Sequence, residues 1–213
     1  MGIKNLYKFI EKYAPDAITQ TKIDKYINSK IAIDFNLMIY KLIYSIRRNG
    51  YDIKNGDHIV THIHALLLKI VKFKELNILP VFVFDGKAPA IKSNTLIQRK
   101  KNWKKMSEKY EKAQDEEQKK KYFYTKSDIT DKELNDCKKL IKIMGYQVIE
   151  SPQEADAQLA FLSKKNLIQY IVSDDMDILL FGGDILLKKF SVATNKKIQE
   201  INLEILKKNL NFS

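Results

Sequence analysis

Four short apolar runs, each followed closely by acidic side chains, constrain the fold of this chain more than any other feature. The runs are KIAIDF (30–35), LPVFVFD (79–85), YQVIE (146–150) and LIQYIVS (167–173). Each is predicted to be a buried strand, and helical patterns separate the runs along the chain. Strands that alternate with helices are typical of a doubly wound, mainly parallel α/β sheet flanked by helices. In such a sheet the carboxyl ends of the strands meet at one edge, where ligands bind.

Apolar spacing and end signals predict the remaining elements. The expected helices are 36–48, 57–76, 131–144 and 152–165. For the last of them, Ser151 is the expected N-cap, Pro152 the first helical residue and Glu154 the capping-box partner. Strands 184–190 and 196–201 are predicted to form a hairpin around Asn195, and the final residues, LEILKKNLNFS, are predicted to be helical.

The stretch 92–126 differs from the rest because basic residues dominate it: Lys92, Arg99, Lys100, Lys101, Lys104, Lys105, Lys109, Lys112, Lys119, Lys120, Lys121 and Lys126. Its apolar residues recur at helical spacings: Trp103, Met106, Tyr110 and Ala113. A stripe this narrow on a polar helix predicts a basic helical insertion outside the core, whose two sides pack together along the stripe.

Charge and cysteine content limit the classes of function that the chain can have. The formal net charge of +12 and the pI of about 9.5 favour a polyanionic partner, with nucleic acid first and an anionic membrane surface second. A merely solvated, lysine-rich surface is the alternative. Cys137 is the only cysteine, which excludes an intramolecular disulfide and a cysteine-based zinc site and suits a reducing, intracellular compartment. No apolar run approaches the roughly 20 residues of a membrane helix, and nucleic acid, not a membrane, is the expected partner.

The acids that follow the four strands form the candidate site: Asp34, Asp85, Glu154, Asp156, Asp174, Asp175 and Asp177. Oxygen ligands without cysteine suit a hard cation such as Mg²⁺ or Mn²⁺. Each acid alone has a simpler explanation, since Asp34 could cap a helix and Asp85 could lie in a turn. Glu154 could serve only the capping box, and Asp156 could favour the helix dipole.

The crowded acids after the fourth strand are harder to explain in that way, because a cap uses one carboxylate. Two divalent ions in an acidic crevice are a common device for phosphodiester hydrolysis. A basic protein with such a crevice has the charge layout expected of a nuclease.

At these residues the sequence resembles the flap endonuclease/XPG superfamily of structure-specific 5′ nucleases, and most closely the flap endonuclease branch. The resemblance spans residues 1 to about 190 and rests on MGIKNLYKFIEKYAPDAI, IAIDFNLMIY, PVFVFDGKAPAIKS, SPQEADAQLAFL and SDDMDILLFGG. It implies that two Mg²⁺ ions, which Mn²⁺ can replace, are held by Asp34, Asp85, Glu154, Asp156, Asp175 and Asp177. Asp174 is not among the implied ligands.

The resemblance also implies residues that contact DNA. Lys92 and Arg99 would contact the scissile phosphate, and Gly2 would lie near the active site. Tyr40 would stack on a base and Arg47 would contact DNA, although Tyr40 could be core and Arg47 could complement a helix C-terminus. Within the basic insertion, the implied DNA-binding residues are Lys100, Lys101 and Lys104.

The implied organisation is one 5′ nuclease domain over 1–213, with an N-terminal region (1–90), a helical arch (91–130) and an internal region (131–213). A further metal-binding Asp, the helix–hairpin–helix element and the clamp-binding peptide of the family are absent from these residues. The expected activity is metal-dependent cleavage at 5′ flaps or 5′ ends of branched DNA in replication or repair, with RNA flaps as further substrates, in the nucleus or at a viral or cellular replication site. The alternatives are a catalytically weak DNA-binding scaffold and a phosphohydrolase of small phosphoesters.

Overall fold

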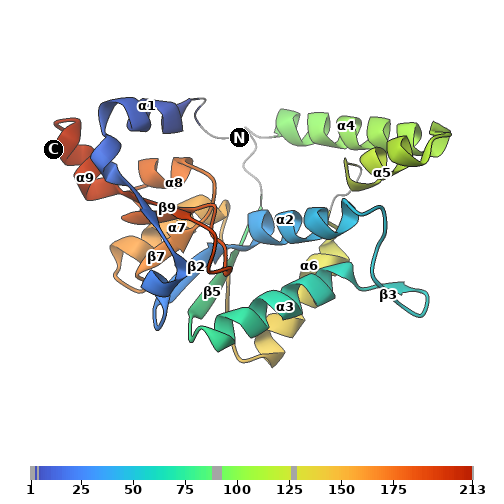
Figure 1. Ribbon diagram of the computed structural model, residues 1–213, viewed down its shortest axis with the longest axis horizontal. Coiled ribbons are helices and arrows are strands. Elements are labelled where there is room, and N and C mark those ends of the chain that lie inside the picture. The colour runs from blue at the N-terminus through green and yellow to red at the C-terminus, as the bar shows by residue number, and fades with distance from the viewer. Residues whose placement is uncertain (1–2, 4, 88–92, 126–128, 213) are drawn as a thin grey trace. The chain divides into compact units, whose positions relative to one another are not determined.

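The computed structural model describes residues 3, 5–87, 93–125 and 129–212 (Figure 1). The chain divides into two compact units. Unit 1 comprises Met1–Leu37, Val71–Gly86 and Tyr146–Ser213, and unit 2 comprises Met38–Ile70 and Lys87–Gly145. Among the described residues, no helix is long and apolar enough to cross a membrane.

Unit 1 is built on a seven-stranded sheet in the order β1-β9-β8-β7-β2-β5-β6. Its strands are β1 (Ile18–Thr21), β2 (Lys30–Asp34), β5 (Leu79–Phe84), β6 (Gln147–Glu150), β7 (Tyr170–Val172), β8 (Ile185–Lys188) and β9 (Ile198–Asn202). The run β6-β5-β2-β7-β8 is parallel, while β9 pairs antiparallel with both β8 and β1. The predicted mainly parallel α/β sheet is therefore confirmed, as is the predicted pairing of 184–190 with 196–201.

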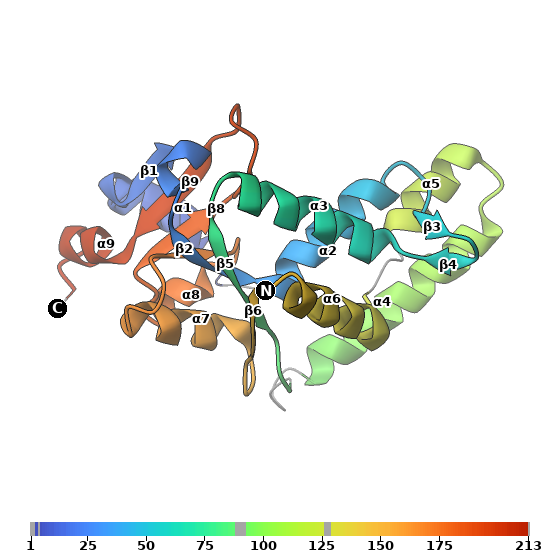
Figure 2. The same ribbon diagram turned by 90° about the horizontal axis from the view of Figure 1, so that it is seen from below.

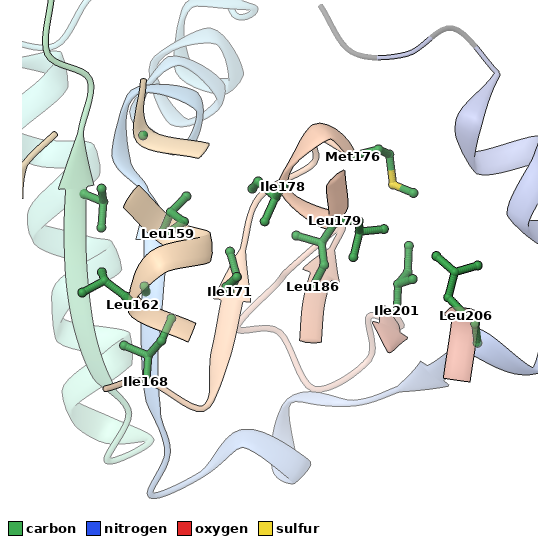
Figure 3. Packing of buried hydrophobic residues seen from close by; sticks show 14 of the residues in the cluster. Leu159, Leu162, Ile168, Ile171, Met176, Ile178, Leu179, Leu186, Ile201 and Leu206 are labelled. Carbon is green, nitrogen blue, oxygen red and sulfur yellow. The ribbon is translucent and has the colours of Figure 1, made fainter. Parts of the chain in front are cut away.

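The period-two alternation of the strands gives the sheet two apolar faces. On one face, side chains from β5, β7, β8 and β9 pack against α7 (Ala155–Lys164) and α8 (Asp177–Leu180), together with α1 (Leu6–Tyr13) and α9 (Leu203–Asn209). Figure 3 shows this cluster, in which Ile171 of β7 lies between Leu162 of α7 and Leu186 of β8. The short helices η1 (Pro15–Ala17) and η2 (Ile23–Tyr26) complete the unit.

The opposite face of the sheet is aromatic. Phe35 stacks on Phe84 with ring centroids 4.0 Å apart and meets Phe82 edge-on at 5.9 Å. Phe73 and Tyr146 also contact Phe82. This packing fixes the start of α2 (Phe35–Arg47) directly beyond Asp34.

Unit 2 is mainly helical. It contains most of α2 and of α3 (Thr61–Glu75), with α4 (Ser93–Lys112), α5 (Glu116–Thr125) and α6 (Asp131–Ile143). The pair α4 and α5 lies side by side (Figures 1 and 2), and Tyr110 contacts Phe123 across it at 5.8 Å. The predicted basic insertion is thus a helical pair, and Tyr110 packs its two sides together as the stripe indicated.

Two helices start later than predicted. A short hairpin of β3 (Lys54–Asn55) and β4 (His58–Ile59) occupies part of the predicted helix 57–76, so α3 begins only at Thr61. Gly56-Asp57 makes its turn, and Gly56 has a φ of 58° that suits glycine. Helix α7 begins at Ala155, because the Ser151 N–H donates to the Phe84 carbonyl at 2.9 Å and so continues the sheet. Ser151 is therefore not the N-cap, and Pro152 is not helical.

Gly86 permits a close backbone crossing beside Asp85. Its N–H donates to the Gln153 carbonyl at 2.5 Å, and a Cβ placed on it would lie 1.9 Å from the Ser151 carbonyl oxygen. We expect Gly86→Ala to lower the free energy of unfolding by about 1–3 kcal/mol, because the 151–154 loop must move. Urea unfolding of this variant and of Lys87→Ala, an exposed neighbour expected to change stability by less than about 0.5 kcal/mol, checks this. Equal unfolding midpoints for the two variants would contradict it.

Candidate functional site

Four neighbouring strands bring the predicted acids to one edge of the sheet. Asp34 is the last residue of β2, and Asp85 directly follows β5. Glu154 is the N-cap residue of α7, which follows β6, while Asp175 and Asp177 follow β7. Since β6, β5, β2 and β7 are parallel neighbours, all these acids lie beyond the same ends of the strands.

Asp34 is the most buried acid of the site, with 8% of its surface exposed. Its Oδ1 accepts a hydrogen bond from the Leu37 N–H at 3.0 Å, and its Oδ2 accepts one from the Ser173 hydroxyl at 3.0 Å. The first bond is that of a helix cap, so the simpler explanation of Asp34 holds for one oxygen. The second bond directs the other oxygen toward the loop after β7.

Ser173 joins the acids of two strands and was missed by the sequence reasoning. Its buried hydroxyl donates to Asp34 and accepts the Asp175 N–H at 3.1 Å. The available signal was a small hydroxyl residue between a buried strand and an acidic cluster. Such a residue can fix the loop by serving as donor and acceptor together.

Asp85, Asp175 and Asp177 are held by backbone N–H groups. Asp85 Oδ1 accepts the Ala155 N–H at 2.9 Å, which links the end of β5 to the start of α7. Asp175 Oδ1 accepts the Asp177 N–H at 3.1 Å, and Asp177 Oδ1 accepts the Ile3 N–H at 3.0 Å. The predicted site residue Gly2 lies outside the described residues.

Glu154 and Asp174 have different outcomes. The Glu154 side chain makes no capping hydrogen bond, so the capping-box interpretation is wrong. Asp174 Oδ1 accepts the Lys189 N–H at 2.7 Å, and the Lys188 ammonium donates to the Asp174 carbonyl oxygen. These bonds fasten the loop to the end of β8, which gives the third crowded aspartate a structural role.

Burial and like charge raise the pKa of two of the acids. The pKa of Asp34 is raised to about 6, first by burial and then by Asp85 and Asp175, against the opposing hydrogen bonds. The pKa of Asp156 is raised to about 7 by burial and then by four neighbouring charges, Asp175, Asp34, Asp85 and Glu154. Asp156 is therefore within electrostatic reach of four of the other five implied metal ligands, and the remaining one, Asp177, donates its N–H to Asp175.

The donor chemistry fits a hard divalent cation. Every candidate ligand is a carboxylate, and an oxygen that accepts one hydrogen bond retains a second lone pair. A cation would also offset the repulsion that raises the pKa of Asp34 and Asp156. Within the described ranges, however, no three His, Cys, Asp or Glu side chains form a group that could hold a metal ion as they stand.

The predicted DNA-binding residues belong to unit 2. Tyr40 on α2 is 42% exposed, so it is not a core residue. Lys101 and Lys104 on α4 are exposed as well. Lys92 and the side chains of Arg99 and Lys100 lie outside the described part of the chain.

Arg47 requires a correction, because its side chain is buried inside unit 2. It is 7% exposed, its Nε donates to Asp52 Oδ1 at 2.7 Å, and its guanidinium lies 3.7 Å from Glu133 Oε1. The Thr61 hydroxyl donates to the same Asp52 oxygen at 2.8 Å. The structure thus gives Arg47 an internal role in place of the predicted DNA contact, because a guanidinium paired inside the unit presents no face to a phosphate.

Comparison with known proteins tests the resemblance directly. The XPG N-terminal domain matches residues 1–106, and the XPG I-region matches residues 145–213. This chain belongs to the XPG/flap endonuclease superfamily. Among curated relatives of this XPG-family chain, Flap endonuclease 1 of Theileria parva is 34% identical over 219 residues, covering 100% of the chain and 44% of the relative. Flap endonuclease 1 of Naegleria gruberi is 35% identical, covering 96% of the chain and 54% of the relative.

Solved structures show the same fold. The catalytic core of Rad2 in complex with DNA substrate superimposes with a TM-score of 0.71 at 24% identity, covering 100% of this chain and 57% of Rad2. Flap endonuclease-1 from Methanococcus jannaschii superimposes with a TM-score of 0.66 at 24% identity, covering 92% of this chain and 64% of that chain. The XPG-family chain spans about half the length of the curated relatives it matches.

The raised pKa values predict how stability depends on pH. Between about pH 4 and pH 7, the folded state holds protons on Asp34 and Asp156 that the unfolded state has released. The free energy of unfolding should therefore fall as the pH rises through this range in EDTA, and Mg²⁺ should restore it. In Asp156→Asn the free energy of unfolding should fall less steeply with pH, and near pH 8 it should exceed that of the parent by about 1–2 kcal/mol. Thermal unfolding across this range checks both, and a parent protein that gains stability with pH would contradict the prediction.

Ser173 offers a second test. Ser173→Ala leaves the Asp175 N–H without its acceptor and Asp34 Oδ2 without its donor, so we expect a loss of about 1–2 kcal/mol in the free energy of unfolding. Ser173→Thr keeps the hydroxyl and should retain most of that stability. If alanine and threonine had equal effects in chemical unfolding, the two hydrogen bonds would not be what stabilises the loop.

Proposed function

We propose that this chain is a metal-dependent 5′ nuclease that cleaves phosphodiester bonds at 5′ flaps or 5′ ends of branched DNA. The observation that carries the proposal is the group of carboxylates beyond four neighbouring parallel strands, where burial and mutual repulsion raise the pKa of Asp34 and Asp156. Family membership supports it, because both XPG regions match the chain.

The residues that would hold Mg²⁺ or Mn²⁺ are Asp34, Asp85, Glu154, Asp156, Asp175 and Asp177. When bound, two such ions supply Lewis-acid stabilisation for phosphodiester hydrolysis. The chain's own contribution is to keep the carboxylates in position. Ser173 and the Leu37 and Ala155 N–H groups do this by binding one oxygen of each acid they contact.

Unit 2 would provide the grip on DNA. Exposed lysines such as Lys101 and Lys104 suit sequence-independent, salt-sensitive binding to phosphates. Lys92 and Arg99 would stabilise charge on the scissile phosphate, and Lys100 would add to the grip. Gly2 would approach the site from the N-terminus. These four assignments rest on the family resemblance.

The substrates follow from the same chemistry. A site that acts on phosphates need not read the sugar, so flaps that contain RNA are included in the proposal. The relatives named Flap endonuclease 1 and the Rad2 core with its DNA substrate support branched DNA as the substrate class. A replication or repair role inside the cell or at a viral replication site follows from this substrate, with no membrane partner.

One observation favours a second candidate, a DNA-binding scaffold of a replication complex with weak or no catalysis. As placed, the described side chains contain no group of three ligands ready to hold a metal ion. A scaffold would keep the basic surface and bind branched DNA without turnover.

An end-labelled 5′-flap duplex tests the proposal. We expect cutting near the flap base in Mg²⁺ or Mn²⁺ and none in EDTA, and a loss of roughly 100-fold or more in Asp175→Asn, because a neutral amide binds a divalent ion poorly. The matched control is Asp174→Asn, which keeps the oxygen that accepts the Lys189 N–H and should cleave normally. Salt-sensitive binding without cleavage in either metal would establish the scaffold instead.

A further inference from the structure

Two tyrosines stack on one side of α2. The ring centroids of Tyr40 and Tyr44 are 6.3 Å apart, and the ring planes are inclined by 28°. Tyr40 is 42% exposed and Tyr44 is partly exposed. Their spacing of four residues places them one turn apart on the same helix face. The family resemblance assigns a role to Tyr40, and nothing assigns one to Tyr44.

The same face continues to an exposed arginine. The Arg48 N–H donates to the Tyr44 carbonyl at 3.0 Å, so the helical geometry extends one residue beyond the end of α2. Arg48 therefore follows Tyr44 by one turn, as Tyr44 follows Tyr40. Its side chain is exposed, whereas the neighbouring Arg47 is buried and paired with Asp52. At a rise of 1.5 Å per residue, the three positions extend over about 12 Å.

We propose that Tyr40, Tyr44 and Arg48, here called the α2 strip, bind one unpaired strand of nucleic acid. The two rings stack on bases, and the Arg48 guanidinium pairs with a phosphate of the same strand. The inference rests on the proposed nuclease function and deepens it by assigning an unpaired strand to a defined surface. It also moves the predicted arginine contact from Arg47 to Arg48.

Three observations favour an unpaired strand as the occupant. Bases offer their faces to side chains only where they are not enclosed in a duplex. The ring separation of 6.3 Å is about twice the 3.4 Å rise of a stacked strand, so the spacing of the rings matches that of stacked bases. The net charge of +12 and the exposed Lys41 beside Tyr40 suit a polyanion. Stacking on tyrosine is tolerant of sequence, as a structure-specific nuclease requires.

Anisotropy of a labelled single-stranded oligonucleotide in EDTA measures binding without cleavage, and variants of the strip isolate its contribution. Tyr44→Leu should weaken binding by at least about 5-fold, whereas Tyr44→Phe should bind like the parent. Tyr51→Leu is the matched control, because Tyr51 is 55% exposed in unit 2 and lies off the strip. Unfolding midpoints of the variants separate a loss of stacking from a loss of helix stability. Unchanged binding in Tyr44→Leu would overturn the proposal.

Abasic oligonucleotides test the stacking itself. If the rings contact bases, removing the bases should weaken binding to the parent. On the abasic oligonucleotide, Tyr44→Leu should then bind no more weakly than the parent. A penalty for Tyr44→Leu that is the same on both oligonucleotides would show that the ring does not stack on a base.

The two neighbouring arginines test the phosphate contact. Arg48→Gln should reduce the slope of log affinity against log salt by about 0.7, the value for one phosphate of a single strand. Arg47→Gln should lower the unfolding midpoint and leave the slope unchanged, because its guanidinium is paired inside unit 2. The reverse pattern would overturn the assignment to Arg48.

The binding test of the α2 strip and the cleavage test of the nuclease can fail separately. Cleavage of the flap with unchanged binding in Tyr44→Leu would refute the α2 strip and leave the proposed function intact. Weakened binding in Tyr44→Leu without metal-dependent cleavage would support the strip and refute the nuclease.

Discussion

Electrostatic repulsion between carboxylates at the edge of the sheet is the constraint on which the candidate site depends. Folding places Asp34, Asp85, Asp156 and Asp175 within electrostatic reach of one another, and the pKa of Asp156 is raised to about 7 as a result of burial and this repulsion. The fold withstands the repulsion because hydrogen-bond donors are directed at the carboxylates of Asp34, Asp85 and Asp175. The Ser173 hydroxyl is central, since it holds Asp34 and the loop of Asp175 together.

The chemistry of the chain is divided between its two units. Unit 1 supplies the carboxylates, set by a parallel sheet with an apolar cluster on one face and aromatic rings on the other. Unit 2 supplies exposed lysines on α4 and the α2 strip, while it encloses Arg47 with Asp52 and Glu133. Neither set of charges is sufficient for a nuclease, because acids alone repel a phosphate and bases alone do not hydrolyse it.

Local patterns failed where a tertiary contact competed with them. Ser151-Pro152 has the signature of a helix start, yet the Ser151 N–H pairs with the Phe84 carbonyl and α7 starts at Ala155. Helix α3 starts late because Gly56-Asp57 forms the turn of a hairpin within the predicted helix. The two arginines at the end of α2 differ by one position, and only packing decides which of them is buried. Ser173 carried no motif of its own and became visible only through its two partners.

The sequence alone determined the mainly parallel sheet, the family and the placement of the acids beyond four strands. The sheet and the placement of the acids follow from short-range patterns, since apolar periodicity sets the strands and the strand ends set the edge. The family follows from the resemblance of longer motifs. Tertiary structure decided which oxygen each acid presents, which residue links them and which arginine faces solvent. Those outcomes depend on contacts such as Ser173 with Asp34 and Arg47 with Glu133, whose partners lie far apart in the chain, so no local pattern encodes them.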